Sequence, residues 1–351
     1  MKKLIIITGI VIVLVGICIY LFFPCRKSET IIEKKEVFSP KTIKKTQEKV
    51  KLNINRYERD IFSLDTTQLA SEIKKLHHLY PSTLIEDDAW NNDYWITRLR
   101  SYLNDQMIND LYKDVNTIFP NLEEITQELE IGFAHYLNFF PNETVPPIIT
   151  VLPGLDLQMP SIYIYDDVLY IHLDMYLGQK NRYYAAFGIP KYICERFDKK
   201  YLVIDCFKKA IVYKHLPEQI NLTILDFMLF EGKKLYFTEM MLPKKEKLDI
   251  IGYTTAKFEW AEKYYGNVWS YLIEKNILFT KEENEIRRYI DESPFTNSFG
   301  NASPGRLGQF LGWKIIQSYM KNNPEITLEK LLQNTDTQDI LNKAKFKPII
   351  R

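Results

Sequence analysis

Residues 229–239 read LFEGKKLYFTE, a stretch in which a carboxylate, a glycine and two lysines interrupt an otherwise apolar run. The periodicity of residues 217–237 predicts one helix. Its inward stripe is formed by Ile220, Ile224, Phe227 and Met228. Glu231 continues this stripe, and a carboxylate on a buried face has to be paired with a cation or neutralised. We therefore expect a buried helix and a partner for Glu231 on another element.

A second stretch, SPGRLGQFLGWKIIQSYM at residues 303–320, contains a suitable partner. Arg306 stands between glycines that leave its backbone room to approach another element, and its guanidinium can bind a carboxylate through two hydrogen bonds. Two interpretations of a Glu231–Arg306 pair stay open. It is either a buried ion pair that fixes two helices, or part of a relic cleft that binds a peptide or a partner protein.

The same stretch predicts a helix over residues 304–320 in which Gly308 and Gly312 lie one turn apart. Each glycine in a helix interior costs about 1 kcal/mol relative to alanine. Two of them on one face therefore indicate that another helix packs closely there. Trp313 and Tyr319 are expected to be core or groove-wall residues.

The N-terminus predicts a tether to a membrane. Two lysines precede an uncharged apolar run over residues 4–24, and Cys25 follows at its end. Such a run is an export signal or a membrane span. A cysteine at that position is typical of a lipoprotein signal, so we expect lipid attachment at Cys25, with an uncleaved span as the alternative. Either tether would place the rest of the chain outside the cytoplasm, and we expect the periplasmic side of the outer membrane.

The composition changes after this anchor. Residues 26–51 contain nine Lys or Arg and four Glu, with too little apolar surface for a core. We expect a signal peptide or anchor over residues 1–25, a polar linker over 26–55 and one globular domain over 56–351. The whole chain has 46 Lys+Arg and 45 Asp+Glu, a net charge of +1, so its charge gives no indication of nucleic-acid binding.

Periodicity in the globular part predicts an α+β fold that is mostly helical with a small central sheet. The predicted strands cover residues 146–153, 161–178 and 201–207, and the predicted helices cover 66–81, 90–119, 122–141 and most of the chain after 217, except for loops near 243–253 and 292–305. Asp166 and Asp167 are expected to form a hairpin turn. Cys194 and Cys206 either pair in an oxidising envelope or are two buried thiols.

The C-terminal half carries several short motifs, which are GK-x-x-Y at residues 232–236, SPGR-x-G-x-x-x-GW at 303–313, SYM at 318–320 and K-x-KP at 345–348. In these motifs the chain resembles the GldB family of gliding-motility lipoproteins, from about Arg56 to the C-terminus. The motif residues are Gly232, Lys233, Tyr236, Gly305, Gly308, Gly312 and Trp313. The resemblance implies a lipid-anchored protein of the cell envelope that supports gliding and the associated secretion machinery. Its partners would be the membrane and other gliding or secretion lipoproteins.

The GldB family is in turn similar to a predicted zinc-peptidase group with an HExxH motif and a later Glu-Gly pair. That similarity implies a zincin-like, gluzincin-type scaffold, with Glu231 at the position of the later metal ligand and His215 at the second histidine. The first histidine and the general base then fall on Ile211 and Val212. Aliphatic side chains cannot bind a metal ion or accept a proton, so we expect a pseudo-metallopeptidase without catalytic residues, bound metal or cofactor.

Two other functions stay open. His215 and Glu218 form an HxxE triplet, which would serve a zinc-dependent peptidase with unusual ligands. The structural interpretation of the same residues is that Pro217 starts a helix and Glu218 lies in its first turn. The third alternative is a periplasmic peptide-binding or chaperone lipoprotein that uses a cleft at Glu231 and Arg306.

Overall fold

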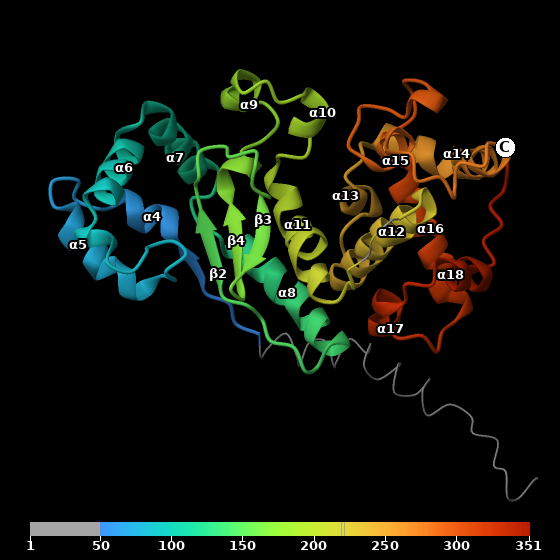
Figure 1. Cartoon of the computed structure of the whole chain (residues 1–351), viewed down its shortest axis with the longest axis horizontal. Coiled ribbons are helices and arrows are strands. Elements are labelled where there is room, and N and C mark those ends of the chain that lie inside the picture. The colour runs from blue at the N-terminus through green and yellow to red at the C-terminus, as the bar shows by residue number, and fades with distance from the viewer. Residues whose placement is uncertain (1–49, 219, 221) are drawn as a thin grey trace, which may run out of the picture. The chain divides into compact units, whose positions relative to one another are not determined.

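A mixed four-stranded sheet organises the part of the chain that the computed structural model describes, which is residues 50–351 without 219 and 221 (Figure 1). Its order is β1-β2-β4-β3, with β1 parallel to β2, β2 parallel to β4, and β3 antiparallel to β4. The strands are β1 (Ile54–Arg56), β2 (Ile148–Val151), β3 (Ile162–Tyr165) and β4 (Val168–His172). Cys25, the apolar run and most of the linker lie outside the described residues, so the expectations for them stay predictions.

The sheet confirms the predicted α+β class and the hairpin, and it moves one domain boundary. Asp166 and Asp167 adopt left-handed backbone angles, with φ of 48° and 57°, as a two-residue turn between β3 and β4 requires. β1 begins at Ile54, inside the segment assigned to the linker, and Val50 is already buried. The linker predicted to end at residue 55 therefore overlaps this strand. Val50, Leu52 and Ile54 alternate with polar residues, which is a strand pattern, but the highly charged segment before them obscured it.

Alternating side chains of the central strands point into two separate cores. Ile148, Leu169 and Ile171 belong to the larger core, while Ile149 and Tyr170 belong to the smaller one. β2 and β4 are buried along their whole length. Parallel strands that are covered on both faces show this continuous burial.

Helices near the N-terminus close the smaller core. These are α4 (Tyr57–Phe62), α5 (Leu69–Leu76) and α6 (Asp93–Asn104), with the 3₁₀ turns η1 (His77–Leu79) and η2 (Ala89–Asn91). The next two, α7 (Gln106–Ile118) and α8 (Glu123–Phe139), pack into the larger core. The single helix predicted over residues 90–119 is thus two helices. They separate at Asp105, whose backbone is extended and whose side chain accepts a hydrogen bond from the Ile108 N–H to cap α7.

The strand predicted over residues 201–207 is instead helical. The short segments of this region are η3 (Leu173–Tyr176), α9 (Arg182–Ala186), α10 (Lys191–Cys194), η4 (Lys199–Tyr201), α11 (Leu202–Asp205), the π-helix η5 (Cys206–Ala210) and η6 (Ile211–Lys214). Residues 201–207 are all buried, so this apolar run has no polar face that could show a helical period. Cys194 and Cys206 are buried free thiols.

Two helices, α12 (Ile224–Met241) and α16 (Leu307–Asn322), cross in the C-terminal half with their backbones in direct contact. A Cβ on Gly312 would lie 1.7 Å from the Met228 carbonyl oxygen, and one on Gly232 would lie 2.3 Å from the Gly312 carbonyl carbon. These distances confirm the close packing predicted from Gly308 and Gly312. The other helices of this half are α13 (Lys247–Ile251), α14 (Thr255–Glu274), α15 (Glu283–Ile290), α17 (Leu328–Gln333) and α18 (Thr337–Ala344), with the 3₁₀ turn η7 (Asn297–Phe299).

The central helix α12 begins later than predicted. The Asp226 carboxylate accepts a hydrogen bond from the Thr223 N–H at 2.8 Å, and the Thr223 hydroxyl accepts one from the Asp226 N–H at 3.3 Å. This capping box fixes the first turn. Ile220, which the prediction placed on the inward stripe, is 87% exposed, whereas Ile224 is buried. The start predicted at Pro217 was wrong because the capping box is the stronger signal for a helix N-terminus.

Candidate functional site

The structure places Glu231 and Arg306 in different contacts. Glu231 on α12 pairs with Lys234 one turn later, at 2.8 Å between Oε1 and Nζ. Lys234 also donates a hydrogen bond to the Tyr213 hydroxyl at 2.9 Å. Burial alone would lower the pKa of Lys234, but the contacts with Glu231 and Tyr213 outweigh this effect and raise the pKa of Lys234. The predicted Glu231–Arg306 pair was therefore wrong, because a lysine at i+3 reaches the carboxylate along the same helix.

His215 is buried at the end of η6 in aromatic surroundings. Its Nε2 lies 2.9 Å from the Tyr136 hydroxyl oxygen, and its ring stacks on Phe140 with the centroids 3.9 Å apart. Burial lowers the pKa of His215. Glu218, the other member of the HxxE triplet, is exposed. The two side chains therefore do not converge, and His215 is a packing residue.

Arg306 belongs to a buried network of charged groups. Its Nε lies 2.9 Å from Glu292 Oε2. Its terminal nitrogens donate hydrogen bonds to the Ile251 and Gly252 carbonyl oxygens at 2.6 and 3.1 Å. These carbonyls lie at the C-terminus of α13, where they have no intrahelical partners. A guanidinium at this end satisfies the carbonyls and interacts favourably with the helix dipole.

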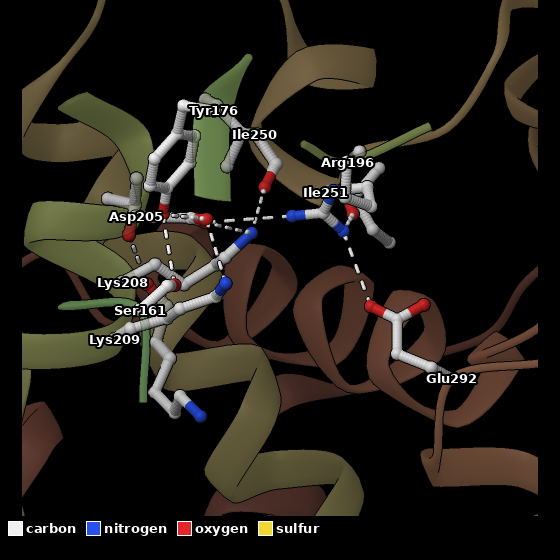
Figure 2. A network of polar contacts seen from close by, with 12 residues as sticks. Ser161, Tyr176, Arg196, Asp205, Lys208, Lys209, Ile250, Ile251 and Glu292 are labelled. Carbon is white, nitrogen blue, oxygen red and sulfur yellow. Dashed lines mark hydrogen bonds and ion pairs between the residues drawn. The ribbon is translucent and has the colours of Figure 1, made fainter. Parts of the chain in front are cut away.

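Arg196 extends the network toward the sheet. Its NH1 group donates to the same Ile251 carbonyl at 3.3 Å and lies 3.5 Å from Glu292, while NH2 lies 3.6 Å from Asp205. Figure 2 shows the guanidinium of Arg196 between the two carboxylates. A Cβ on Gly252 would lie 2.3 Å from the guanidinium carbon, and the φ of Gly252 is +75°. Glycine is therefore required beneath the arginine.

Asp205 is the carboxylate at the centre of this network (Figure 2). It lies 2.8 Å from the Lys209 ammonium and 3.5 Å from that of Lys208, and it accepts a hydrogen bond from the Tyr176 hydroxyl at 2.9 Å. Burial alone would raise the pKa of Asp205, but the three cations around the carboxylate outweigh it and hold the pKa well below its usual range. Asp205 is therefore ionised at neutral pH.

Cations outnumber carboxylates in the network. Its four cations are Arg196, Lys208, Lys209 and Arg306, and its two carboxylates are Asp205 and Glu292. Lys208 donates to the Ile250 carbonyl at 3.1 Å, and burial together with the neighbouring cations lowers its pKa well below the usual value. Three consecutive carbonyls at the end of α13 thus accept hydrogen bonds from buried basic side chains. The arrangement is a clamp that holds η5, α13 and the start of α16 together, and its charged groups are engaged with one another.

Comparison with known proteins identifies the family. The model of the family described as gliding motility protein GldB matches residues 39–348. The chain belongs to the GldB family. Searches of curated proteins and of solved structures find no match. GldB proteins are gliding-motility lipoproteins of the cell envelope, as the sequence resemblance implied.

The glycines of the GldB motifs lie at close backbone contacts. Gly232 and Gly312 form the crossing of α12 and α16, and a Cβ on Gly308 would lie 2.7 Å from the tip of Ile290. A Cβ on Gly305 would lie 2.2 Å from the Ser293 carbonyl oxygen. The glycine positions of the GldB motifs are therefore explained by helix and loop packing.

The larger GldB motif residues join neighbouring elements. Lys233 is 2% exposed and donates hydrogen bonds to carbonyls at the end of α17, including that of Leu332 at 3.4 Å. Burial lowers the pKa of Lys233 to about 8. Trp313 is buried, and its indole N–H donates to Glu239 at 2.9 Å. Tyr236 is half-buried, and burial raises its pKa to about 12.

From the sequence, the first histidine and the general base of a peptidase motif were expected at two aliphatic residues. Ile211 and Val212 are both fully buried. Within residues 50–351 apart from 219 and 221, no group of three or more His, Cys, Asp or Glu is arranged to hold a metal ion. Over the same described residues, no helix has both the length and the apolarity to cross a membrane.

Sequence reasoning missed Arg196, Asp205 and Glu292. One signal for the clamp was present, because Lys208 and Lys209 follow Asp205 at helical spacing inside an apolar run. Because residues 201–207 were predicted to form a strand, the helical spacing of these charged residues was not recognised. Glu292 lies in a predicted loop and has no comparable local signal, because only the fold brings it to the arginines.

Proposed function

We propose that this GldB protein is a non-catalytic lipoprotein of the cell envelope that supports gliding motility and the associated protein secretion. Its lipid would be attached at Cys25, on the periplasmic side of the outer membrane. The observation that carries the proposal is the role of the family motifs, which build the α12–α16 crossing and the clamp at Arg306. Residues that define the family thus stabilise a rigid body that can dock to envelope partners.

The positions expected to carry peptidase chemistry support the non-catalytic part of the proposal. Ile211 and Val212 offer no lone pair, and the His215 ring is held by Tyr136 and Phe140. Glu231, the remaining counterpart of a ligand, is neutralised by Lys234. We further propose a zincin-like pseudo-peptidase scaffold, in which the positions predicted for metal ligands serve packing.

Gene replacement in the source bacterium tests the cellular role. A deletion should stop cell gliding and reduce secretion, and the wild-type gene should restore both. Cys25→Ala should abolish lipid attachment, which mass analysis of the N-terminus would detect, and should stop gliding. His215→Phe should keep gliding, because an aromatic ring preserves the stack on Phe140. Normal gliding and secretion in the deletion strain would contradict the proposal.

Metal analysis of the purified full-length chain tests the non-catalytic part. We expect far less than one zinc ion per chain after extraction in detergent without chelator. One equivalent of zinc, lost in both His215→Phe and Glu231→Gln, would instead establish a metal site with unusual ligands. Abundance of each variant in the envelope fraction serves as the control for folding.

A further inference from the structure

A groove on the outer side of α6 has the features of a small-ligand site. Its volume is about 410 Å³, and it is lined by α6 and by the segment that precedes it, including Glu86, Trp95, Arg98 and Tyr102. Sites for small molecules in proteins commonly measure 300–1,000 Å³ and combine apolar walls with a few polar groups. This groove lies apart from the GldB motifs and from the clamp.

The aromatic wall of the groove follows from the spacing of α6. Trp95, Leu99 and Tyr102 stand at i, i+4 and i+7 on one face, while Ile96 and Leu103 are buried. Tyr94 extends the same wall and is 70% exposed. Trp95, Leu99 and Tyr102 are half-buried and pack on the edge of the smaller core, so only part of each side chain lines the groove. Aromatic rings in such a wall present large apolar faces at their surface.

Three polar groups in the groove are free to bind a ligand. Among the residues that the structure describes, the Glu86 carboxylate and the Trp95 indole N–H have no hydrogen-bond or ion-pair partner. The Arg98 guanidinium is likewise unpaired, and its contact is with the Tyr94 ring at 5.7 Å. The groove therefore offers one strong acceptor and two donors beside the exposed ring of Tyr94 and the half-buried ring of Trp95. Its opposite charges disfavour a ligand that carries only one sign of charge.

We propose that this groove binds N-acetylated amino-sugar units of a glycan. A pyranose ring has a C–H face that packs on an aromatic ring, and its acetamido group adds an N–H donor, a carbonyl acceptor and a methyl group. The N–H matches the Glu86 carboxylate, and the carbonyl matches the Arg98 guanidinium or the Trp95 N–H. Binding of a peptide by β-strand addition would need a free sheet edge, and this groove is formed by helix and loop side chains.

Calorimetric titration of the full-length chain with chitotetraose tests the proposal. The protein is kept in a detergent without a sugar headgroup, so that the detergent does not occupy the groove. We expect saturable binding with one site per chain, at least tenfold weaker binding by Trp95→Ala, and an intermediate loss for Trp95→Phe, which keeps a ring but removes the N–H. Tyr165→Ala is the matched control, because Tyr165 is an aromatic residue 60% exposed on the β3–β4 hairpin. It should bind like the wild type.

Two further ligands test the role of the acetamido group. Cellotetraose, which has hydroxyls instead, should bind at least fivefold more weakly than chitotetraose, and Glu86→Gln and Arg98→Gln should reduce this preference. Tighter binding of fully deacetylated chitotetraose would show simple attraction to carboxylates and would overturn the proposal. Absence of chitotetraose binding would overturn it as well, as would unchanged binding by a folded Trp95→Ala variant. Circular dichroism of each variant verifies the fold.

Discussion

Replacing Gly312 by alanine should destabilise the protein, although the same change stabilises an ordinary helix. Alanine is favoured over glycine in a helix interior by about 1 kcal/mol. At this position the new Cβ would lie 1.7 Å from the Met228 carbonyl oxygen and 2.4 Å from its carbonyl carbon. Close C···O contacts normally measure about 3.3 Å. The helices α12 and α16 must therefore separate by more than an ångström to accept one methyl group.

The size of the loss follows from what has to move. Overpacking a core typically costs about 1–3 kcal/mol when side chains can shift. Here the obstacle is backbone, and a gap of about 0.5–1 Å already forfeits a quarter to a half of each dispersion contact across the interface. We expect a net loss of about 3 kcal/mol after the gain in helix propensity. Gly308→Ala is the comparison on the same helix, because its Cβ would meet the tip of Ile290 at 2.7 Å and the Tyr289 carbonyl oxygen at 2.9 Å, which requires a much smaller displacement of backbone. Its loss should be about 1–2 kcal/mol, below that of Gly312→Ala.

Guanidinium unfolding monitored by tryptophan fluorescence measures both variants. Gly232→Ala should be destabilised like Gly312→Ala, because its Cβ would meet the Gly312 carbonyl carbon at 2.3 Å. The double variant should lose at least about 1 kcal/mol less than the sum of the single variants, since one displacement of the helices relieves both clashes. A Gly312→Ala protein as stable as the wild type, or strict additivity in the double variant, would refute the assigned crossing.

Three further predictions concern the clamp, Lys233 and the register of α16. Asp205→Asn removes the carboxylate that pairs with Lys208 and Lys209 and one of the two that pair with Arg196, so it should cost about 3–5 kcal/mol by denaturant unfolding. Glu283→Gln, which removes the exposed pair with Arg287, should cost less than about 0.5 kcal/mol. Equal losses would contradict the clamp. The pKa of Lys233 is about 8 in the folded protein against 10.5 ordinarily, so between these values the unfolded chain binds more protons and stability rises with pH. Between about pH 7.5 and about pH 10.5, the free energy of unfolding of the wild type should therefore rise by on the order of 2–3 kcal/mol relative to that of Lys233→Met. A difference between the two proteins that does not change with pH would show that Lys233 is not desolvated. Insertion of one alanine directly after Gly308 rotates the following residues of α16 by about 100°, so it should abolish cooperative unfolding measured by circular dichroism. An alanine inserted after Asn323, beyond the helix, should be tolerated. Similar unfolding midpoints for the two insertion variants would exclude a fixed register of α16 against α12.

The sequence predicted those features that depend on a residue type with one characteristic structural role. Paired glycines one turn apart predicted the close helix contact, and the Asp166–Asp167 pair predicted the hairpin, because both depend on local geometry. The predicted strand over residues 201–207 failed for the opposite reason. That segment is buried on all sides, so neither a period of two nor a helical period is visible in its apolar residues.

The partner of Arg306 could not be found from the sequence. Glu231 lies on an apolar helix, so the sequence indicated that its partner came from another element. In the structure, the side chain of Lys234, three residues later on the same helix, extends back to Glu231 and pairs with it. Glu292 follows α15 in an irregular segment, and its position beside Arg306 depends on how that segment returns to α16. Ion pairs between distant elements depend on the tertiary path, so spacing along the chain carries no information on them.

The SPGR-x-G-x-x-x-GW motif is one mechanical unit in this fold. Arg306 fixes the start of α16 to the carbonyls that end α13, and Gly312 sets the depth at which the same helix meets α12. The indole of Trp313 then bonds to Glu239, which holds the rotation of α16 against α12. These three contacts fix the start, the depth and the rotation of the same helix. Loss of any one of them should therefore weaken the other two. The spacing within the motif is therefore set by the α-helical repeat, which explains why it combines an arginine with glycines and a tryptophan.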